Sequence, residues 1–323
     1  DNVTTVIIFA PLTVLVTRML NLNPVPFLIA EAMMSNIGGA ATLVGDPPNI
    51  IIGSAANIDF VTFLVNMAPL VLPPWLGTMA LLLIMFRKSL RRDMGTPEEI
   101  DLDETKAISD PVLLRRMLFV MGLVIGLFFV HHFLHYYPAF VSLIGLAIAF
   151  ILVRPHADQC ITEVDWSVLL FFASLFVIVG GVEATGLLDL IGVQLAEAAR
   201  DPELFLLTAI ALMWIAAFVS AIIDNIPFTV TMIPIVMALA AEGVNVYPLW
   251  WALAIGVALG GNGTHVGATA NIIVVAQAEK SGIPGGKITP LEWIKVGAPV
   301  MFVGLVLASA TFALIYYTIG WNE

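Results

Sequence analysis

The sequence predicts an all-α polytopic membrane protein that contains inverted repeats, re-entrant hairpins and broken transmembrane helices. Its composition is 60% hydrophobic and 11% charged, with a mean hydropathy of +0.99, whereas soluble domains carry roughly 25% charged residues. A glycine- and proline-rich insert interrupts apolar sequence at residues 35–51, and a similar insert follows at 260–273. A third motif, Asp-Asn with a proline ten residues after the Asp, occurs at Asp1 and again at Asp224.

These motifs indicate an internal duplication. Residues 38–51 align with 260–273 at a constant offset of 222 positions (260 − 38), which pairs Gly45 with Gly267 and Asn49 with Asn271. The Asp-Asn motifs align at an offset of 223 (224 − 1). Two ordered motifs repeated at nearly one offset are typical of a duplicated unit.

The first insert predicts a broken membrane span. A helix cannot continue through Gly38-Gly39 and then Pro47-Pro48, so we predict half-helices at 26–35 and 49–57 joined by an irregular loop. In a membrane such backbone is tolerated only where it is buried in protein or lines a wet cavity. Transporters build ion and substrate sites from loops of this kind.

The remaining sequence predicts further helices and a topology. Residues 87–116 hold seven of the thirteen Lys and Arg, so the positive-inside rule predicts a cytoplasmic loop and an outside C-terminus in a plasma (inner) membrane protein. The chain then enters and leaves the first Asp-Asn tip from the cytoplasmic side, and the second tip from the outer side. The two repeats therefore have inverted orientations in the membrane. We expect helices at 3–20, 60–86, 117–133, 138–153, 166–181 with a break at Gly180-Gly181, 187–200, 204–223, 230–241 and 293–317, with a second broken span at 248–277.

The domain organisation follows from the repeats. Residues 1–86 form the first inverted repeat, 87–116 the cytoplasmic loop and 117–323 the second repeat, and a pseudo-twofold axis in the membrane plane relates 1–86 to 224–318. The tip at Asp224 follows membrane sequence, so we expect the first repeat to have helices on the N-terminal side of Asp1 that are missing here. The lone cysteine, Cys160, excludes a disulfide framework and a cysteine metal site. The aromatic and histidine-rich stretch 131–137 predicts an interfacial turn.

Three carboxylates are the first candidates for chemistry: Asp1, Asp46 and Asp224. A charge at the bilayer centre costs at least about 2.5–3.5 kcal/mol, so an acid at membrane depth is functional by default. The alternative for each is an N-cap, because Asp and Asn both cap helix starts. Asp46 has no twin, since Ala268 holds the matching position.

Amide, hydroxyl and backbone groups complete the candidate ion- or substrate-binding set. Their oxygens suit hard cations such as Na⁺, while the alternative is that they satisfy broken-helix backbone. Beside the carboxylates, this set contains Asn2, Thr4, Thr5, Asn36, Gly38, Gly39, Thr42, Asn49, Asn225, Thr229, Gly261, Asn262, Thr264, His265 and Asn271. His265 could carry protons or make a structural hydrogen bond; Glu31 and Glu183 are either proton carriers or interfacial acids, and Arg18 is a snorkelling end residue.

The two inserts and the two Asp-Asn tips resemble the ion transporter superfamily, and most closely the ArsB/NhaD-type permeases, a group that includes the melanosomal P protein. The likeness spans nearly the whole chain, and the loop Gly45-Asp46-Pro47-Pro48-Asn49 is a specific match. The more distant INDY-type sodium/dicarboxylate symporters, which share a citrate-transporter-like domain, have Ser-Asn-Thr at the tips and Gly-Thr-Pro-Pro-Asn in the loop. The resemblance implies re-entrant hairpins, a homodimer and elevator-like motion. It implies one Na⁺ site at Asn2, Asn36, Gly38 and Asn49, and a second at Asn225, Gly261, Thr264 and Asn271.

These features favour an ion-coupled secondary transporter, and a Na⁺/H⁺ (cation/proton) antiporter above others, because carboxylates at the tips repel anions. An arsenite or other small-anion permease, a Na⁺-coupled carboxylate symporter and a passive channel stay open. An intramembrane aspartyl protease is a remote alternative, since Val44-Gly45-Asp46 resembles its Gly-x-Gly-Asp loop but position 43 is Leu. We expect no cofactor beyond Na⁺ or H⁺ as coupling ion. The expected partners are a small inorganic ion or small anion and the lipid bilayer, and no nucleic acid.

Overall fold

The fold of the described residues is entirely helical. The computed structural model describes residues 1–20, 22–90, 110–164, 166–186, 199, 201–282, 286–318 and 321, and it contains no strand within them. Five helices in these ranges are long and apolar enough to cross a membrane: Asn2–Met19, Phe60–Met85, Pro111–Val130, Glu203–Ile222 and Pro290–Thr318. The predicted class of an all-α polytopic membrane protein is therefore confirmed.

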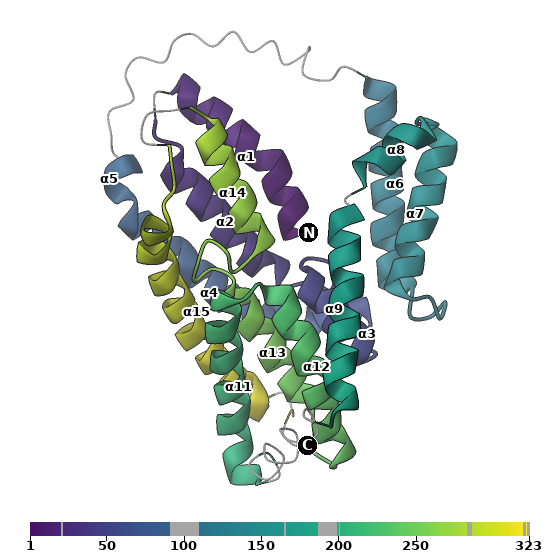
Figure 1. Cartoon of the computed structure of the whole chain (residues 1–323), viewed down its shortest axis with the longest axis vertical. Helices are drawn as coiled ribbons and strands as arrows, with labels where there is room; N and C mark the ends of the chain where they lie inside the picture. The colour runs from purple at the N-terminus through teal and green to yellow at the C-terminus, as the bar shows by residue number, and fades with distance from the viewer. Residues whose placement is uncertain are drawn as a thin grey trace. The chain divides into compact units, whose positions relative to one another are not determined.

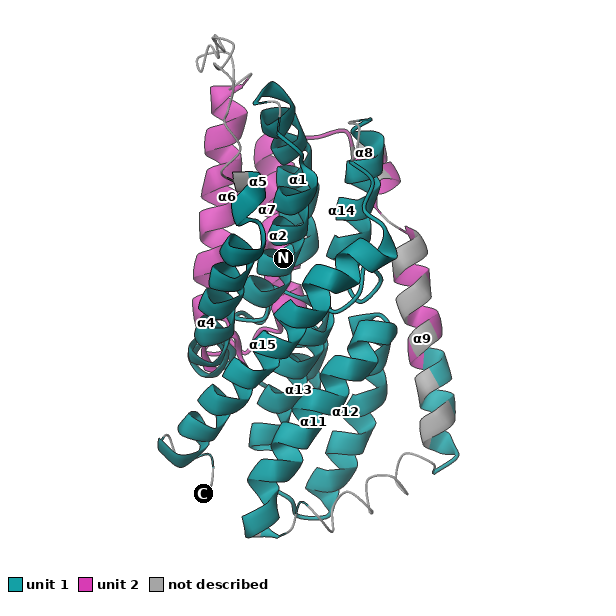
Figure 2. Ribbon diagram, turned by 90° about the vertical axis from the view of Figure 1, so that its left-hand side faces the viewer, with its two compact units in different colours: residues 1–58, 63–98, 177–323 teal, residues 59–62, 99–176 magenta. Residues whose placement is uncertain are grey.

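The chain divides into two compact units (Figure 2). Unit 2 contains residues 59–62 and 99–176, and in it α6 (Pro111–Val130) packs against α7 (Pro138–Val153). The predicted turn at 131–137 lies between these helices and is held by buried His131. The Phe60 N–H donates to His131 Nε2 at 3.1 Å, so Nδ1 carries the proton and donates to Tyr136 O at 2.7 Å. Helix α8 (Ala157–Glu163) follows, and α9 (Trp166–Ala184) belongs to unit 2 up to Phe176 and to unit 1 from Val177.

Unit 1 contains both broken spans. The first follows α1 (Asn2–Met19) and consists of α2 (Val25–Gly39) and α3 (Pro47–Ala55); α4 (Phe60–Met85) and α5 (Arg87–Leu90) come next. The second follows α11 (Pro202–Ile222) and α12 (Asn225–Ala241) and consists of α13 (Tyr247–Gly260) and α14 (Thr269–Lys280), before α15 (Pro290–Thr318). The predicted half-helices are confirmed, with α2 ending at the predicted Gly38-Gly39 break and α3 beginning at Pro47.

Helix packing in unit 1 pairs equivalent elements. Helix α1 packs against α2 and α14, while α12 packs against α13 and α3. Exchanging α1 with α12, α2 with α13 and α3 with α14 therefore turns one set of contacts into the other. In Figure 1, α1 and α12 begin near the middle of unit 1 and run toward opposite ends.

Some of the predicted helix boundaries need correction. Helix α6 begins at Pro111, inside the stretch predicted as loop, because Asp110 accepts hydrogen bonds from Val112 N and Leu113 N at 2.9 Å and proline fits the first helical turn. The predicted break at Gly180-Gly181 is wrong, since α9 continues to Ala184; glycine costs a helix only about 1 kcal/mol. The short helix α8 was not predicted, and the predicted helix 187–200 lies almost wholly outside the described residues.

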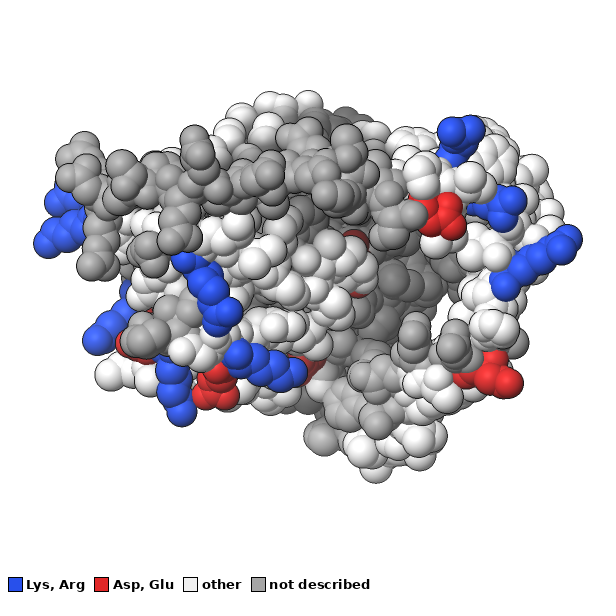
Figure 3. Space-filling model, turned by 90° about the horizontal axis from the view of Figure 1, so that it is seen from above, with Lys and Arg blue, Asp and Glu red and all other residues white. Residues whose placement is uncertain are grey.

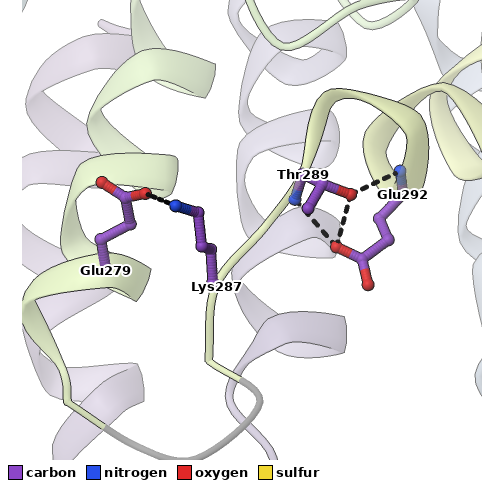
Figure 4. Close-up of polar contacts among 4 residues, drawn as sticks. All are labelled: Glu279, Lys287, Thr289 and Glu292. Carbon is purple, nitrogen blue, oxygen red and sulfur yellow. Dashed lines mark hydrogen bonds and ion pairs between the residues drawn. The ribbon is translucent and has the colours of Figure 1, made fainter.

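Polar contacts among Glu279, Lys287, Thr289 and Glu292 lie at the link from α14 to α15 (Figure 4). Lys287 Nζ lies 3.3 Å from Glu279 Oε1. The N–H and the hydroxyl of Thr289 both donate to Glu292 Oε2 at 2.8 Å, and Glu292 N donates back to Thr289 Oγ1 at 3.2 Å. This reciprocal pair is a capping box, and it fixes where α15 begins.

Basic residues lie at one end of α1 and α14. Arg18 is in the last turn of α1 and Lys280 in the last turn of α14. The two ends are tied together, because Arg18 Nη2 donates to Ser281 O at 2.6 Å. The face seen from above in Figure 3 carries blue basic side chains near its edges.

Glycines allow each interrupting loop to close on itself. A Cβ at Gly39 would lie 2.4 Å from Gly45 O, and one at Gly45 would lie 2.2 Å from Gly39 O. The second loop repeats this approach less tightly, because a Cβ at Gly267 would lie 2.8 Å from Gly261 O. The paired glycines in the sequence thus mark the place in each loop where the backbone crosses itself at close range.

We predict that Gly45→Ala destabilises the protein by about 1–3 kcal/mol, because the methyl group overlaps a backbone oxygen that cannot move aside. Unfolding in mixed detergent micelles measures the change. The matched control is Gly126→Ala in α6, where a Cβ would have nothing within 4 Å. Equal effects of the two changes would contradict this account.

Candidate functional site

Both interrupting loops use the same hydrogen-bond frame. Asn49 Nδ2 donates to Gly39 O at 3.2 Å and to Thr42 O at 2.9 Å. Its twin Asn271 donates to Gly261 O at 2.7 Å and to Thr264 O at 2.9 Å. Each residue of the second frame lies 222 positions after its equivalent in the first frame. The duplication seen in the sequence is therefore also present in the hydrogen bonds.

The first Asp-Asn tip inserts beside the first loop. Asn2 N donates to Gly45 O at 2.9 Å, and Asn2 Nδ2 donates to Asn36 Oδ1 at 3.1 Å. Ser35 Oγ donates to Asn2 O at 3.1 Å. Asp1 itself is exposed and caps α1, with Thr4 N donating to its Oδ2 at 3.0 Å. It is therefore Asn2, and not Asp1, that enters the loop.

The second tip reaches across to the first loop. Asn225 Nδ2 lies 3.4 and 3.5 Å from the two carboxylate oxygens of Asp46. Asn2 also hydrogen-bonds the Asp46 side chain, so Asp46, only 2% exposed, receives amide groups from both tips. Asp224 caps Ile226 N at 3.0 Å and takes a hydrogen bond from Thr269 at the start of α14.

Four helix N-termini, those of α1, α3, α12 and α14, thus meet around this centre. Their backbone N–H groups carry partial positive charge, which favours the ionised carboxylates. Within the described residues, no Lys or Arg side chain takes part in these contacts. Among the described residues, the positive potential at the centre therefore comes from backbone N–H groups and from the side-chain amides of Asn2 and Asn225.

Asn36 connects the two halves directly. Its Nδ2 donates to Asn262 Oδ1 at 3.0 Å and to Asn271 Oδ1 at 2.9 Å, while its Oδ1 accepts from Asn2. Asn262 in turn donates to Met33 O at 3.3 Å, and Trp293 Nε1 donates to Asn262 O at 3.0 Å. These three asparagines are at most 1% exposed, so their bonds are shielded from water.

This bridge breaks the correspondence between the two loops. The residue equivalent to Asn36 is Ala258, which has no amide group. Asn49 Oδ1 therefore lacks the hydrogen bond that Asn271 Oδ1 accepts from Asn36. Asn49 Oδ1 is accordingly buried without a hydrogen-bond partner among the described residues. The first loop therefore presents a free amide oxygen at a place where the second loop does not.

The other predicted residues have local roles or lie at the edge. The hydroxyls of Thr4 and Thr5 bond Asp1, that of Thr229 donates to Asn225 O at 2.8 Å, and that of Thr264 donates to Ala221 O. Thr42, Gly39 and Gly261 offer backbone oxygens, whereas Gly38 is exposed and faces away from the network. His265 is half-buried, and its Nδ1 has no partner in the described part of the chain. The side chain of Glu183 lies outside the described residues.

Sequence reasoning missed the contacts between the halves. It paired each tip with its own loop, which fits Asn2 beside Asn36 and Asp224 beside Thr269, but it missed the contact of Asn225 with Asp46 in the other loop. It also did not select Ser35 or Trp293. A pattern of 222-residue offsets identifies equivalent positions and carries no signal for which half contacts which. The described residues contain no group of three His, Cys, Asp or Glu side chains that could together hold a metal ion.

Comparisons with known proteins agree with this architecture. A family model described as "Citrate transporter" (CitMHS) matches residues 1–256. The chain belongs to the CitMHS citrate transporter family. It is 41% identical over 323 residues to an uncharacterized transporter of Mycobacterium tuberculosis, covering 99% of this chain and 74% of that protein. A 46 kDa membrane protein of Mycobacterium leprae is 39% identical over 320 residues, covering 98% of this chain and 73% of that protein.

The human P protein is 31% identical over 408 residues, covering 100% of this chain and 48% of that protein. The resemblance to the permeases that include the P protein is therefore confirmed. The chain is an integral membrane protein and a secondary transporter of a small solute, and membership of this family excludes the protease alternative.

We predict that Asn36→Ala and Asn271→Ala are energetically coupled, because each change removes the same bond. A double-mutant cycle of unfolding free energies should give a coupling of about 0.5–3 kcal/mol. Asn36→Ala combined with Asn245→Ala is the control, since Asn245 bonds Trp321 O and shares no partner with Asn36. Additivity in both cycles would show that the bridge contributes nothing.

Proposed function

We propose that the chain exchanges a cation, Na⁺ above others, for H⁺, and that its two repeats are inverted about an axis in the membrane plane. The observation that carries this proposal is Asp46. It is a buried carboxylate that both tips contact, in a centre to which no Lys or Arg side chain contributes among the described residues. A site of this kind attracts cations and repels anions.

The exchange follows from the cost of burying charge. A carboxylate removed from water is strongly destabilised unless a proton or a cation neutralises it. Asp46 and Asp224 are close enough for their charges to interact, which increases the need for a neutralising partner. A centre that must hold either H⁺ or a cation before it changes conformation couples the two fluxes.

The inverted arrangement is supported by three features described above. The hydrogen bonds of the two loops correspond at one offset, the packing partners of α1 and α12 exchange, and these helices run to opposite ends of unit 1. Inverted repeats with broken helices are the architecture of alternating access. Under the positive-inside rule, the end that carries Arg18 and Lys280 faces the cytoplasm and the C-terminus lies outside. The homodimer implied by the resemblance belongs to the same proposal.

For the first cation site we favour the start of α3 over the full set implied by the resemblance. Asn49 Oδ1 is buried and has no hydrogen-bond partner in the part of the chain that the structure describes, and Asp46 lies one turn earlier in the chain. Asn36 has both N–H groups engaged with the other half, and Gly38 is exposed. Na⁺ prefers oxygen ligands, and the free amide oxygen and the carboxylate supply two.

Carboxylate symport is the second candidate, because the matching family model is described as a citrate transporter. The four converging helix N-termini could hold an anion if bound cations first neutralised the aspartates. Transport in proteoliposomes under an imposed pH gradient, scanned over Na⁺, Li⁺, arsenite and citrate, separates the two. Uptake of citrate that requires Na⁺, without cation/proton exchange, would replace our first choice.

We predict that Asp46→Asn lowers cation/proton exchange at least about tenfold, because the amide keeps the shape but cannot exchange a proton for a cation, and each lost 1.4 kcal/mol of binding is a factor of ten. Fluorescence of a pH dye inside proteoliposomes measures the rate. Asp224→Asn should act in the same direction. Asp201→Asn is the control, since Asp201 caps α11 in the same chemical manner but lies away from the centre. Wild-type rate and pH dependence in Asp46→Asn would defeat the mechanism.

A second prediction concerns the cation ligand. Asn49→Ala should raise the KM for Na⁺ by about tenfold, the loss of a contact worth roughly 1.4 kcal/mol. Asn262→Ala is the comparison, because its side-chain amide is fully engaged with Met33 and Asn36 and should alter stability more than KM. An unchanged KM in Asn49→Ala would remove Asn49 from the site.

A further inference from the structure

The turn between α6 and α7 holds the first residues of α4. Residues 59–62 belong to unit 2 together with α6 and α7, whereas α4 from Phe63 onward belongs to unit 1 (Figure 2). Within unit 2, the ring of Phe60 stacks on Phe128 with 5.5 Å between the ring centroids, and it meets Phe129 edge-on at 5.3 Å. Phe60 is 7% exposed, so the first turn of α4 is packed into the apolar part of unit 2.

His131 is the polar partner in this packing. It is 5% exposed, whereas His132 and His135 of the same turn are exposed. Its Nε2 accepts the Phe60 N–H at 3.1 Å, and its Nδ1 lies 2.7 Å from Tyr136 O, which can only accept. Phe60 occupies the first position of α4, where an N–H has no partner within the helix. The imidazole of His131 therefore supplies the hydrogen bond that the helix cannot.

The two bonds of His131 can coexist only on a neutral ring. Neutral imidazole offers one acceptor nitrogen, here Nε2, while it donates from the other. A second proton turns Nε2 into a donor, which then faces the Phe60 N–H at the positively polarised start of a helix. Proton binding and the bond to Phe60 thus compete. The bond is present while the ring is neutral and is lost as the pH falls.

The carboxylate of Asp59 stands at the same helix start. It caps α4 by accepting from Val61 N at 2.9 Å and from Thr62 N at 3.0 Å. Burial raises the pKa of Asp59, but the hydrogen bonds from Thr62 and Val61 and the nearby His132 outweigh burial and hold that pKa below its usual value. Asp59 is therefore ionised near neutral pH and is not the group whose charge changes there. The other titratable side chains of the turn are those of His132, His135, Tyr136 and Tyr137.

We propose that His131 forms a pH-sensitive contact, in which the neutral ring holds the start of α4 on the α6–α7 turn and protonation releases it. Histidine is the side chain whose charge ordinarily changes between about pH 5 and 8, and protonation of histidines is an established way of opening protein contacts. The residues of this contact are distinct from those of the Asp46 centre. The inference therefore stands apart from the ion that the protein carries.

Release at Phe60 affects a helix that packs in unit 1 as well. Phe63, one turn later in α4, lies edge-on to Trp251 of α13, with 5.5 Å between the ring centroids. Helix α13 leads directly into the second interrupting loop. Acidification that frees the start of α4 thus acts on a neighbour of the second broken span, which gives the contact a means of regulating transport.

The N–H of Phe60 provides the test. Hydrogen–deuterium exchange with single-residue resolution, on the protein in lipid nanodiscs, gives its protection factor at about pH 7.5 and at about pH 5.5, inside the range in which histidine titrates. The values are corrected for the intrinsic effect of pH on exchange. We expect wild-type protection to fall about tenfold at the lower pH, since a single competing proton changes an equilibrium by up to tenfold per pH unit.

His131→Gln removes the titration and retains one acceptor and one donor, so its protection should be the same at the two pH values. The comparison uses the ratio of the two values, and it holds whether or not glutamine makes the bond to Phe60. His135→Asn is the matched control, because His135 lies in the same turn, is exposed and has a positive φ that asparagine tolerates; it should behave as the wild type.

Three results would overturn the proposal. The first is wild-type protection of Phe60 that is equal at the two pH values. The second is a fall in His131→Gln as large as in the wild type, which would assign the pH dependence to another group. The third is loss of the pH dependence in His135→Asn, which would place the responsive group on the exposed side of the turn.

Discussion

Irregular backbone inside an apolar bundle must find its hydrogen bonds within the protein, and the rest of this structure depends on that constraint. Two loops that no helix can span leave carbonyl groups without helical partners. Asn49 and Asn271 satisfy them with one side chain each, by placing an amide between two turns of the loop. Glycines stand where the loop backbone crosses itself. They make this geometry possible, because a side chain there would push apart the two backbone segments that the asparagine amide connects. Two loops whose backbone carbonyl groups are hydrogen-bonded within unit 1 are the result.

The same constraint explains why the centre is polar. Once the backbone is satisfied, the remaining polar groups are available for other contacts, and they are mostly amides and carboxylates. Asn36 uses its amide to tie the halves together, whereas Asp46 gathers amides from both tips. The structural roles and the proposed transport role therefore belong to different residues of one network. We expect a change at Asn36 to alter how the two halves pack together, and a change at Asp46 to alter the binding of the transported ion.

Much of this fold could be predicted from sequence because its signals are local or periodic. Proline and glycine positions predicted the breaks at 38–39 and 47–48, and long apolar runs predicted α4 and α7 nearly to the residue. The start of α6 was missed because charge composition was weighed above the Asp110-Pro111 capping signal, and Gly180-Gly181 was overvalued as a helix breaker. The candidate residues in the loops were found because duplication marks them twice. Which tip meets which loop was not predictable in the same way, because the contact of Asn225 with Asp46 joins positions with no sequence relation.

The alanines that replace Asn36 and Asp46 in the second half, Ala258 and Ala268, have a thermodynamic consequence. A carrier made of two identical inverted halves would have inward- and outward-facing states of equal free energy, since symmetry converts one into the other. Here the buried charge and the free amide oxygen belong to one loop alone, so the two orientations place them in different surroundings. A difference of 1.4 kcal/mol between the states would already make the empty carrier rest on one side of the membrane about ten times as often as on the other. Under the proposed alternating access, the replacement of Asn36 by Ala258 and of Asp46 by Ala268 in the second half would therefore set the side of the membrane on which the empty carrier rests.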